Sequence, residues 1–253
     1  MLGRRAAVLV VCAVLGPAGC ASGQTGGGAT ASPASPTSAT AAAQDYGCLT
    51  PDQVPGAYQL KLSDQPTTAD AFAAGHGRVG VVLAHMAGES VCEWAPWVSK
   101  FAAEGYLATT FTAVGPTDAN VGDAITELKR RGATRVLLVG GSKGGTAVLV
   151  AASRPQALPV AAVVSLSGPA QYQGMDAGAA VPRLTMPVLF MADADDSPFD
   201  DDAKSLAAEA KRAQVHWLKL YPGASHASAV LGNPAALADF TAFVAKYAPP
   251  TVG

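Results

Sequence analysis

The chain has 253 residues, of which 49% are hydrophobic and 14% are charged, and its formal net charge at pH 7 is −2. This length allows one large domain or two small ones, and the hydrophobic fraction is typical of a compact fold. The small net charge and the lack of a basic cluster argue against binding of nucleic acid.

The first 19 residues have the organisation of an export signal. Arg4 and Arg5 precede an apolar run over residues 6–15, and the small-residue stretch "GPAGC" follows. The apolar run is shorter than the roughly 20 residues that a permanent transmembrane helix needs. We therefore expect residues 1–19 to be a signal peptide.

The end of this segment resembles the lipobox of bacterial lipoproteins, in which a small residue precedes the cysteine that carries the lipid. Gly19 precedes Cys20 here, although Pro17 stands where that motif usually has leucine. The resemblance implies a lipid anchor at Cys20 on the outer face of the bacterial cell membrane, with plain secretion as the alternative. Residues 20–44 would be the anchor and a flexible linker, since small and polar residues dominate them.

Cysteine usage predicts a disulfide. Cys12 would leave with the signal and Cys20 would carry lipid, so Cys48 and Cys92 remain as a pair outside the reducing cytoplasm. A bond between them would close a loop of about 45 residues and stabilise the fold by up to about 4 kcal/mol. Two separate buried thiols are the alternative.

From residue 45 to residue 250, apolar runs and helical periodicity alternate, as in a single α/β domain. Strands are expected at residues 57–62, 79–85, 106–112, 135–139, 160–166, 187–191 and 216–221. Helices are expected at residues 94–104, 118–131, 143–153, 201–213 and 234–247. Such continuous apolar strands predict a mostly parallel central sheet with helices on both faces. The acidic run at residues 200–202 fits a helix N-terminus better than a metal site.

A serine lies among glycines where a predicted strand passes into a predicted helix. The residues Gly140, Gly141, Ser142, Lys143 and Gly144 satisfy the motif G-x-S-x-G. A turn this sharp brings the backbones on either side of the serine so close that a Cβ would clash. Ser142 would then be strained, with its hydroxyl above the carboxyl edge of the sheet. We interpret it as a nucleophile, and a plain glycine turn is the alternative.

A histidine and several acids follow in the loops after two later strands. His226 comes after the strand "HWLKLY", and the stretch "ADADDSPF" comes after the strand "PVLFM". A parallel sheet brings both loops to the edge where Ser142 lies. His226 suits a general base, because an ordinary pKa of about 6.5 lets it take and return a proton near neutral pH. The orienting acid would be Asp196, then Asp195, with Asp193 third.

These residues resemble the serine hydrolases of the α/β-hydrolase fold, and the likeness covers about residues 58–247. By that resemblance, Ser142 is the nucleophile. Members of that family commonly carry a strand beginning "PVL", then glycine, two residues and the acid. Placing Pro187 on that proline puts Asp196 on the acid and Asp193 on the glycine. This departure at Asp193 keeps Asp195 open as the acid.

The loop "HMAGES" resembles the oxyanion loop of the same family, His-Gly-x. Met86 replaces the glycine and Ala87 takes the last position. The resemblance implies an oxyanion hole made by the backbone N–H groups of Ala87 and Lys143, with Met86 as the alternative donor. We expect His85 to support this loop structurally. The Lys143 side chain should point outward, because the residue after the nucleophile begins a helix.

Residues 170–185 leave no room for the helical lid that many relatives insert, so we expect no cap domain and an open site. The expected activity is hydrolysis of a small-molecule carboxylic ester through an acyl-enzyme intermediate. We expect a monomer, and no metal or organic cofactor is implied. Acyl transfer on the same triad and a catalytically silent binding lipoprotein are the alternatives.

Overall fold

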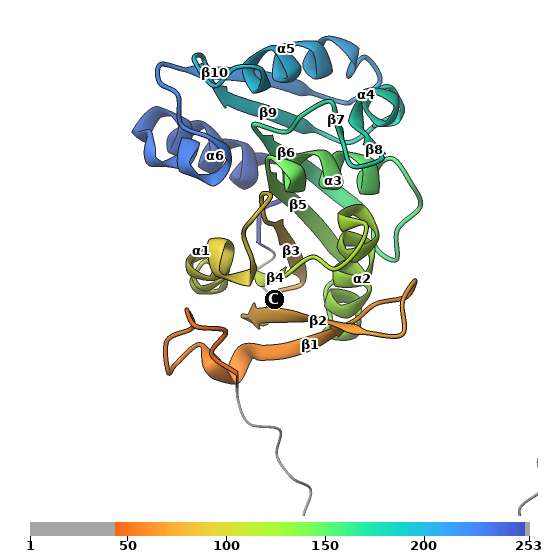
Figure 1. Ribbon diagram of the computed structural model, residues 1–253, viewed down its shortest axis with the longest axis vertical. Helices are drawn as coiled ribbons and strands as arrows, with labels where there is room; N and C mark the ends of the chain where they lie inside the picture. The colour runs from red at the N-terminus through yellow and green to blue at the C-terminus, as the bar shows by residue number, and fades with distance from the viewer. Residues whose placement is uncertain (1–43, 251–253) are drawn as a thin grey trace, which may run out of the picture. The chain divides into compact units, whose positions relative to one another are not determined.

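An eight-stranded β-sheet runs through residues 44–250, the part of the chain that the computed structural model describes (Figure 1). The expected signal peptide, the lipidation at Cys20 and nearly all of the linker lie outside these residues. The strands lie in the order β1-β2-β4-β3-β5-β6-β9-β10. Strands β3 to β6, β9 and β10 pair in parallel, whereas β2 is antiparallel to both of its neighbours. The predicted mostly parallel sheet is therefore confirmed.

The strands of the sheet are β1 (Ala57–Lys61), β2 (Thr68–Ala74), β3 (Val79–Ala84), β4 (Leu107–Phe111), β5 (Arg135–Gly141), β6 (Val160–Leu166), β9 (Val188–Asp193) and β10 (His216–Tyr221). The helices are α1 (Val91–Ala103), α2 (Thr117–Arg130), α3 (Lys143–Ala152), α4 (Ala177–Ala180), α5 (Phe199–Glu209) and α6 (Pro234–Tyr247). Short 3₁₀ turns lie at η1 (Val54–Gly56), η2 (Val181–Arg183) and η3 (Ala227–Gly232). Within residues 44–250, no helix combines the length and the apolar composition that a membrane-spanning segment requires.

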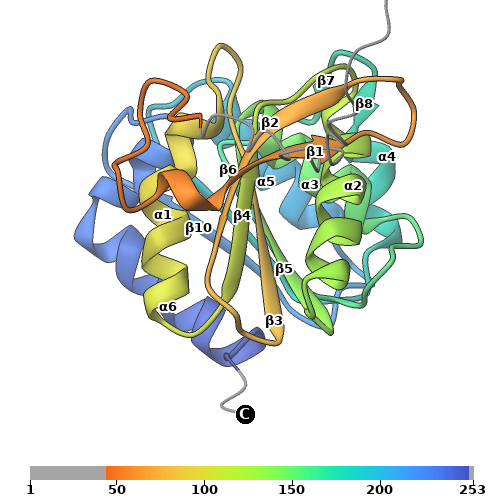
Figure 2. The same ribbon diagram turned by 90° about the horizontal axis from the view of Figure 1, so that it is seen from below.

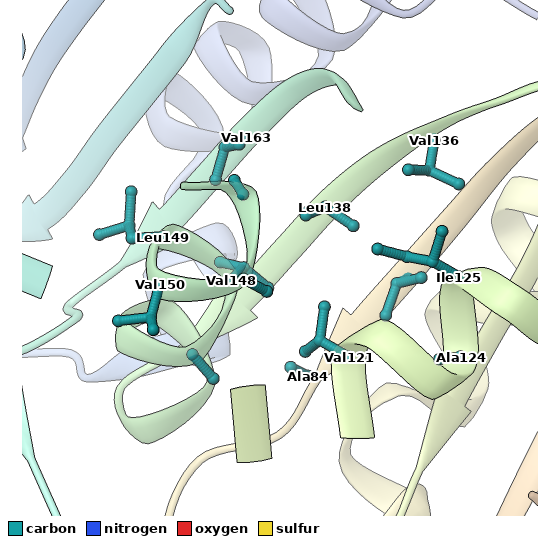
Figure 3. Packing of buried hydrophobic residues seen from close by; sticks show 14 of the residues in the cluster. Ala84, Val121, Ala124, Ile125, Val136, Leu138, Val148, Leu149, Val150 and Val163 are labelled. Carbon is teal, nitrogen blue, oxygen red and sulfur yellow. The ribbon is translucent and has the colours of Figure 1, made fainter. Parts of the chain in front are cut away.

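Helices cover both faces of the sheet, as predicted. In Figure 2, α1 and α6 lie on one side of the sheet, and α2, α3 and α5 lie on the other. Side chains of β5 pack into the hydrophobic core on both faces of the sheet, because successive side chains of a strand point to opposite faces. Val136 and Leu138 pack with α2 and α3 through Ile125 and Val148, all fully buried (Figure 3). This two-sided burial explains why β5 reads as a continuous apolar run.

Several elements differ from the expectation: α4 and the two short strands before it were not expected, and α5 ends at Glu209, four residues before the predicted end. The physical reason is clear for β2 and α1. The alanine-rich segment "TADAFAA" has a weak strand signal in its sequence, since alanine and aspartate are depleted in strands. It forms β2 because β1 and β4 pair with it on both sides. Helix α1 begins at Val91, three residues earlier than expected, since Ser90 caps it by accepting the N–H of Cys92 at 3.3 Å.

The N-terminal part of the described chain is joined to α1 by a disulfide between Cys48 and Cys92, whose Cα atoms are 5.7 Å apart. This is the pairing that the sequence predicted. The chain between β6 and β9 forms a short ribbon, β7 (Gln171–Tyr172) and β8 (Met175–Asp176), followed by α4 and η2.

Candidate active site

Ser142 lies at the turn between β5 and α3, with φ 50° and ψ −118°, and is 6% exposed. Both flanking glycines are needed for this turn. A Cβ on Gly140 would collide with the carbonyl oxygen of Gly144, and a Cβ on Gly144 would collide with that of Ala84 at the end of β3. The steric reason expected for G-x-S-x-G therefore applies here.

Backbone strain gathers around this turn. Ser167, after β6, and Ala227, after His226, also have positive φ values of 50° and 55°. Hydrogen bonds join the segments that carry these residues: the N–H of Ser142 donates to the carbonyl of Leu166, next to Ser167, at 2.8 Å, and the N–H of Ala227 donates to Oγ of Ser167 at 3.1 Å. Such conformations cost about 1–3 kcal/mol each and persist only where surrounding contacts hold them, typically at functional sites.

His226 and Asp196 are brought together by the loops after β10 and β9. Nδ1 of His226 lies 2.9 Å from Oδ2 and 3.1 Å from Oδ1 of Asp196, which is 8% exposed. The ring of Phe199 packs against the imidazole with centroids 4.3 Å apart. Asp195 is exposed, and its N–H is bound to the carbonyl of Gly223. The geometry thus pairs the histidine with Asp196, the acid ranked first.

The histidine loop packs against the turn that carries Ser142. A Cβ on Gly141, the residue before Ser142, would lie only 2.9 Å from the Cβ of Ala227, the residue after His226. Within residues 44–250, Ser142 and His226 form no hydrogen bond with each other, and their proximity follows from the contact between Gly141 and Ala227. The sequence-predicted nucleophile, base and acid all lie at the carboxyl edge of the sheet.

Two side chains hold the backbone on either side of His226. Oδ2 of Asp193 accepts the N–H of Ser225 at 2.8 Å, and Oγ of Ser167 accepts the N–H of Ala227. Both Asp193 and Ser167 are buried. Asp193, which stands where the family usually has glycine, thus stabilises the histidine loop. Its difference from the family pattern was the feature of the sequence that marked this position. No sequence signal pointed to Ser167.

One candidate oxyanion donor in the loop after β3, the N–H of Met86, already has a hydrogen-bond partner. The N–H of Met86 donates to Oε2 of Glu93 at 2.7 Å, so it is not free to bind an oxyanion. The N–H of Lys143 is the first of α3, and the first N–H groups of a helix have no partner within the helix. Of the three candidate donors, Ala87 and Lys143 therefore remain.

Neither His85 nor Lys143 has the surroundings of a catalytic base. Nδ1 of His85 lies 2.7 Å from the carbonyl of Met86, and Nε2 accepts the N–H of Ala113 at 2.8 Å. Burial, helped by the charge of Lys143, lowers the pKa of His85 from 6.5 to about 4, so the ring joins two loops as a neutral group. The Lys143 side chain is half-buried rather than fully exposed, and burial lowers its pKa while Glu93 opposes the shift.

Several solved structures share this fold. An esterase of Pyrococcus furiosus superimposes with a TM-score of 0.65 at 12% identity, covering 76% of this chain and 91% of that one. A dienelactone hydrolase of Anabaena variabilis gives 0.59 at 21% identity, covering 76% and 94%. A Butyrivibrio proteoclasticus protein, Est1E, gives 0.57 at 15% identity, covering 75% and 99%. No sequence among the curated proteins matches this chain.

Fold and family together define a serine-type carboxylic ester hydrolase of the α/β-hydrolase fold. More narrowly, the chain belongs to the dienelactone hydrolase family, whose sequence profile matches residues 109–245. The matched region begins in β4 and contains Ser142, Asp196 and His226.

The glycine turn yields a stability prediction. Gly144→Ala should lower the free energy of unfolding by about 2–3 kcal/mol, because its Cβ would meet the backbone of Ala84, which cannot move aside. Gly122→Ala in α2 is the matched control: its Cβ would have only Gln156 Oε1 nearby, at 3.5 Å, and should be neutral or stabilise by about 0.5–1 kcal/mol. Denaturant unfolding of both variants measures this difference, and equal midpoints would contradict the steric account.

Proposed function

We propose that this protein hydrolyses small carboxylic esters through an acyl-enzyme intermediate on Ser142, with His226 as general base and Asp196 as the acid that orients it. The observation that carries the proposal is the contact of Asp196 with Nδ1 of His226 in a loop that packs against the Ser142 turn. The similar Pyrococcus protein is an esterase and the similar Anabaena protein is a dienelactone hydrolase, which supports ester chemistry here, since a lactone is a cyclic ester.

The contact at Nδ1 determines how the histidine would act. A carboxylate at Nδ1 favours the tautomer with the proton on that nitrogen, which leaves Nε2 free to accept the hydroxyl proton of Ser142. The serine oxygen then forms a bond to the ester carbonyl carbon, and the carbonyl oxygen becomes an oxyanion. The backbone N–H groups of Ala87 and Lys143 would bind it.

Collapse of this intermediate breaks the bond to the alcohol, which leaves with the proton from His226. A water molecule then gives its proton to His226 and attacks the acyl group on Ser142. The carboxylic acid is released and the serine regains its proton. Asp196 would stabilise the imidazolium in both halves of the reaction, and its burial strengthens this interaction by excluding water.

We further propose that the protein is exported, anchored through Cys20 and active as a monomer, with residues 20–44 as the linker; secretion without an anchor remains the alternative. The disulfide between Cys48 and Cys92 supports export, because such bonds persist mainly outside the reducing cytoplasm. The proposed triad is complete within one chain, so a monomer would be competent for the reaction.

The nucleophile is tested with a fluorophosphonate probe. The wild-type domain should be labelled at Ser142, whereas Ser142→Ala should not be labelled and should lose at least about 10³-fold in kcat on a nitrophenyl ester. Ser153→Ala, at the end of α3, is the control and should keep both properties. Unlabelled wild-type protein, or equal labelling of Ser142→Ala, would refute the proposed nucleophile.

The identity of the orienting acid is tested by replacing each of two neighbouring aspartates with asparagine. Asp196→Asn should lower kcat by about 10⁴-fold, because the amide can favour the wrong imidazole tautomer. Asp195→Asn should change kcat by less than about twofold, since an exposed side chain makes no such contact. Steady-state kinetics on a soluble ester compares them, and the reverse ranking would transfer the role to Asp195.

Acyl length tests the expectation of an open site. The segment between β6 and β9 forms only β7, β8, α4 and η2, which supports a site without a large lid. Short soluble esters should show ordinary saturation, and longer acyl chains should gain far less than the roughly 0.8 kcal/mol per methylene that full burial gives. A strong preference for long chains, or a rate increase on emulsions, would instead indicate an apolar groove.

A further inference from the structure

Glu93 is a carboxylate beside the proposed active site that the acyl-enzyme chemistry does not use. It lies in the first turn of α1, which is fixed in three ways. Ser90 caps the helix, the N–H of Val91 donates to Oγ1 of Thr112 at 3.1 Å, and the neighbouring Cys92 forms the disulfide. The position of the Glu93 backbone is therefore tightly constrained.

One carboxylate oxygen of Glu93 holds the oxyanion loop. Oε2 accepts the N–H of Met86 at 2.7 Å. This is short for a bond from a backbone N–H, as expected when the acceptor is charged. Met86 directly precedes Ala87, the proposed oxyanion donor of this loop, so the bond fixes the peptide unit next to that donor.

The other oxygen faces the nucleophile turn and the histidine loop. A Cβ on Gly141 would lie 3.3 Å from Oε1 of Glu93 and 3.3 Å from the backbone nitrogen of Ser228. Oε1 is buried and has no hydrogen-bond partner among the described residues. The absence of a side chain at Gly141 thus allows the carboxylate to approach the end of β5 and the residues after His226.

The groups around Glu93 shift its pKa in opposite directions. Burial raises the pKa of Glu93, and repulsion from Glu89 adds to the shift. The Ser228 side chain, the Met86 N–H and His226 oppose it. On the side of α3, Glu93 counteracts the lowering of the pKa of Lys143 by burial. The carboxylate therefore interacts with groups from the oxyanion loop, the nucleophile turn and the histidine loop.

We propose that Glu93 is a positioning residue for ester hydrolysis, which aligns the oxyanion loop with the nucleophile turn by accepting the N–H of Met86 while packing against Gly141 and the histidine loop. The bond also occupies the Met86 N–H, so that this loop donates to the oxyanion through Ala87. This inference rests on the proposed roles of Ser142, His226 and Ala87.

The test compares three variants on a short soluble nitrophenyl ester. Glu93→Ala should lower kcat by about 30- to 100-fold with KM within about threefold, because a misplaced oxyanion donor weakens binding of the transition state and not of the substrate. Glu93→Gln should recover kcat to within about fivefold of wild type, since the amide oxygen can still accept the Met86 N–H. Glu104→Gln, exposed at the other end of α1, should match wild type.

Kinetics are expressed per active site, counted by complete labelling with the fluorophosphonate, so loss of folded protein does not imitate loss of kcat. The rate constant of labelling should fall in parallel with kcat in Glu93→Ala. A wild-type kcat in Glu93→Ala would overturn the proposal. So would an equal loss in Glu93→Gln and Glu93→Ala, because the charge, not the bond to Met86, would then matter.

If Glu93→Ala does not fold, Glu93→Asp decides. It keeps the charge but is one methylene shorter, so it should lose the Met86 bond and show the alanine-like fall in kcat; wild-type kcat would overturn the proposal. Failure of the underlying function is separately visible, because wild-type protein would then fail to label at Ser142 before any Glu93 variant is compared.

Discussion

The close approach of three backbone segments at the nucleophile turn is the constraint on which the site depends. The end of β3, the end of β5 and the start of α3 meet where Gly140 and Gly144 have no side chains. Ser142 lies at this contact in its strained conformation, and α3 begins at the next residue. The strain is sustained by the buried layers on both faces of β5, since a tightly packed core resists the movement that would relieve it.

Several buried polar side chains at the same edge of the sheet form hydrogen bonds with backbone groups. Asp193 and Ser167 hold the amides on either side of His226, and His85 links the loops after β3 and β4. Backbone amides buried without acceptors are costly, so each side chain stabilises a loop that would otherwise have to stay solvated. The proposed catalytic groups thus project from loops whose own geometry is tightly determined.

Electrostatics at this edge favour a neutral His85 beside the half-buried Lys143 and Glu93. The charge of Glu93 counteracts the effect of burial on the pKa of Lys143, whereas a proton on His85 would be buried next to a cation. The proposed base, His226, instead contacts a carboxylate. Two histidines of one chain therefore suit different tasks, because one lies in the packed interior and the other lies in a loop with an acid as its neighbour.

The local sequence determined much of the fold and of the candidate active site. Strand and helix periodicity predicted the parallel sheet, G-x-S-x-G predicted the turn at Ser142, and chain order predicted Asp196 and His226 at one edge, since parallel strands end together. Only the tertiary structure decided that β2 is a strand, that Asp196 rather than Asp195 meets His226, and that Asp193 and Glu93 brace the loops. These outcomes depend on partners distant in the chain, and neither propensity nor spacing encodes which groups pair across a folded core.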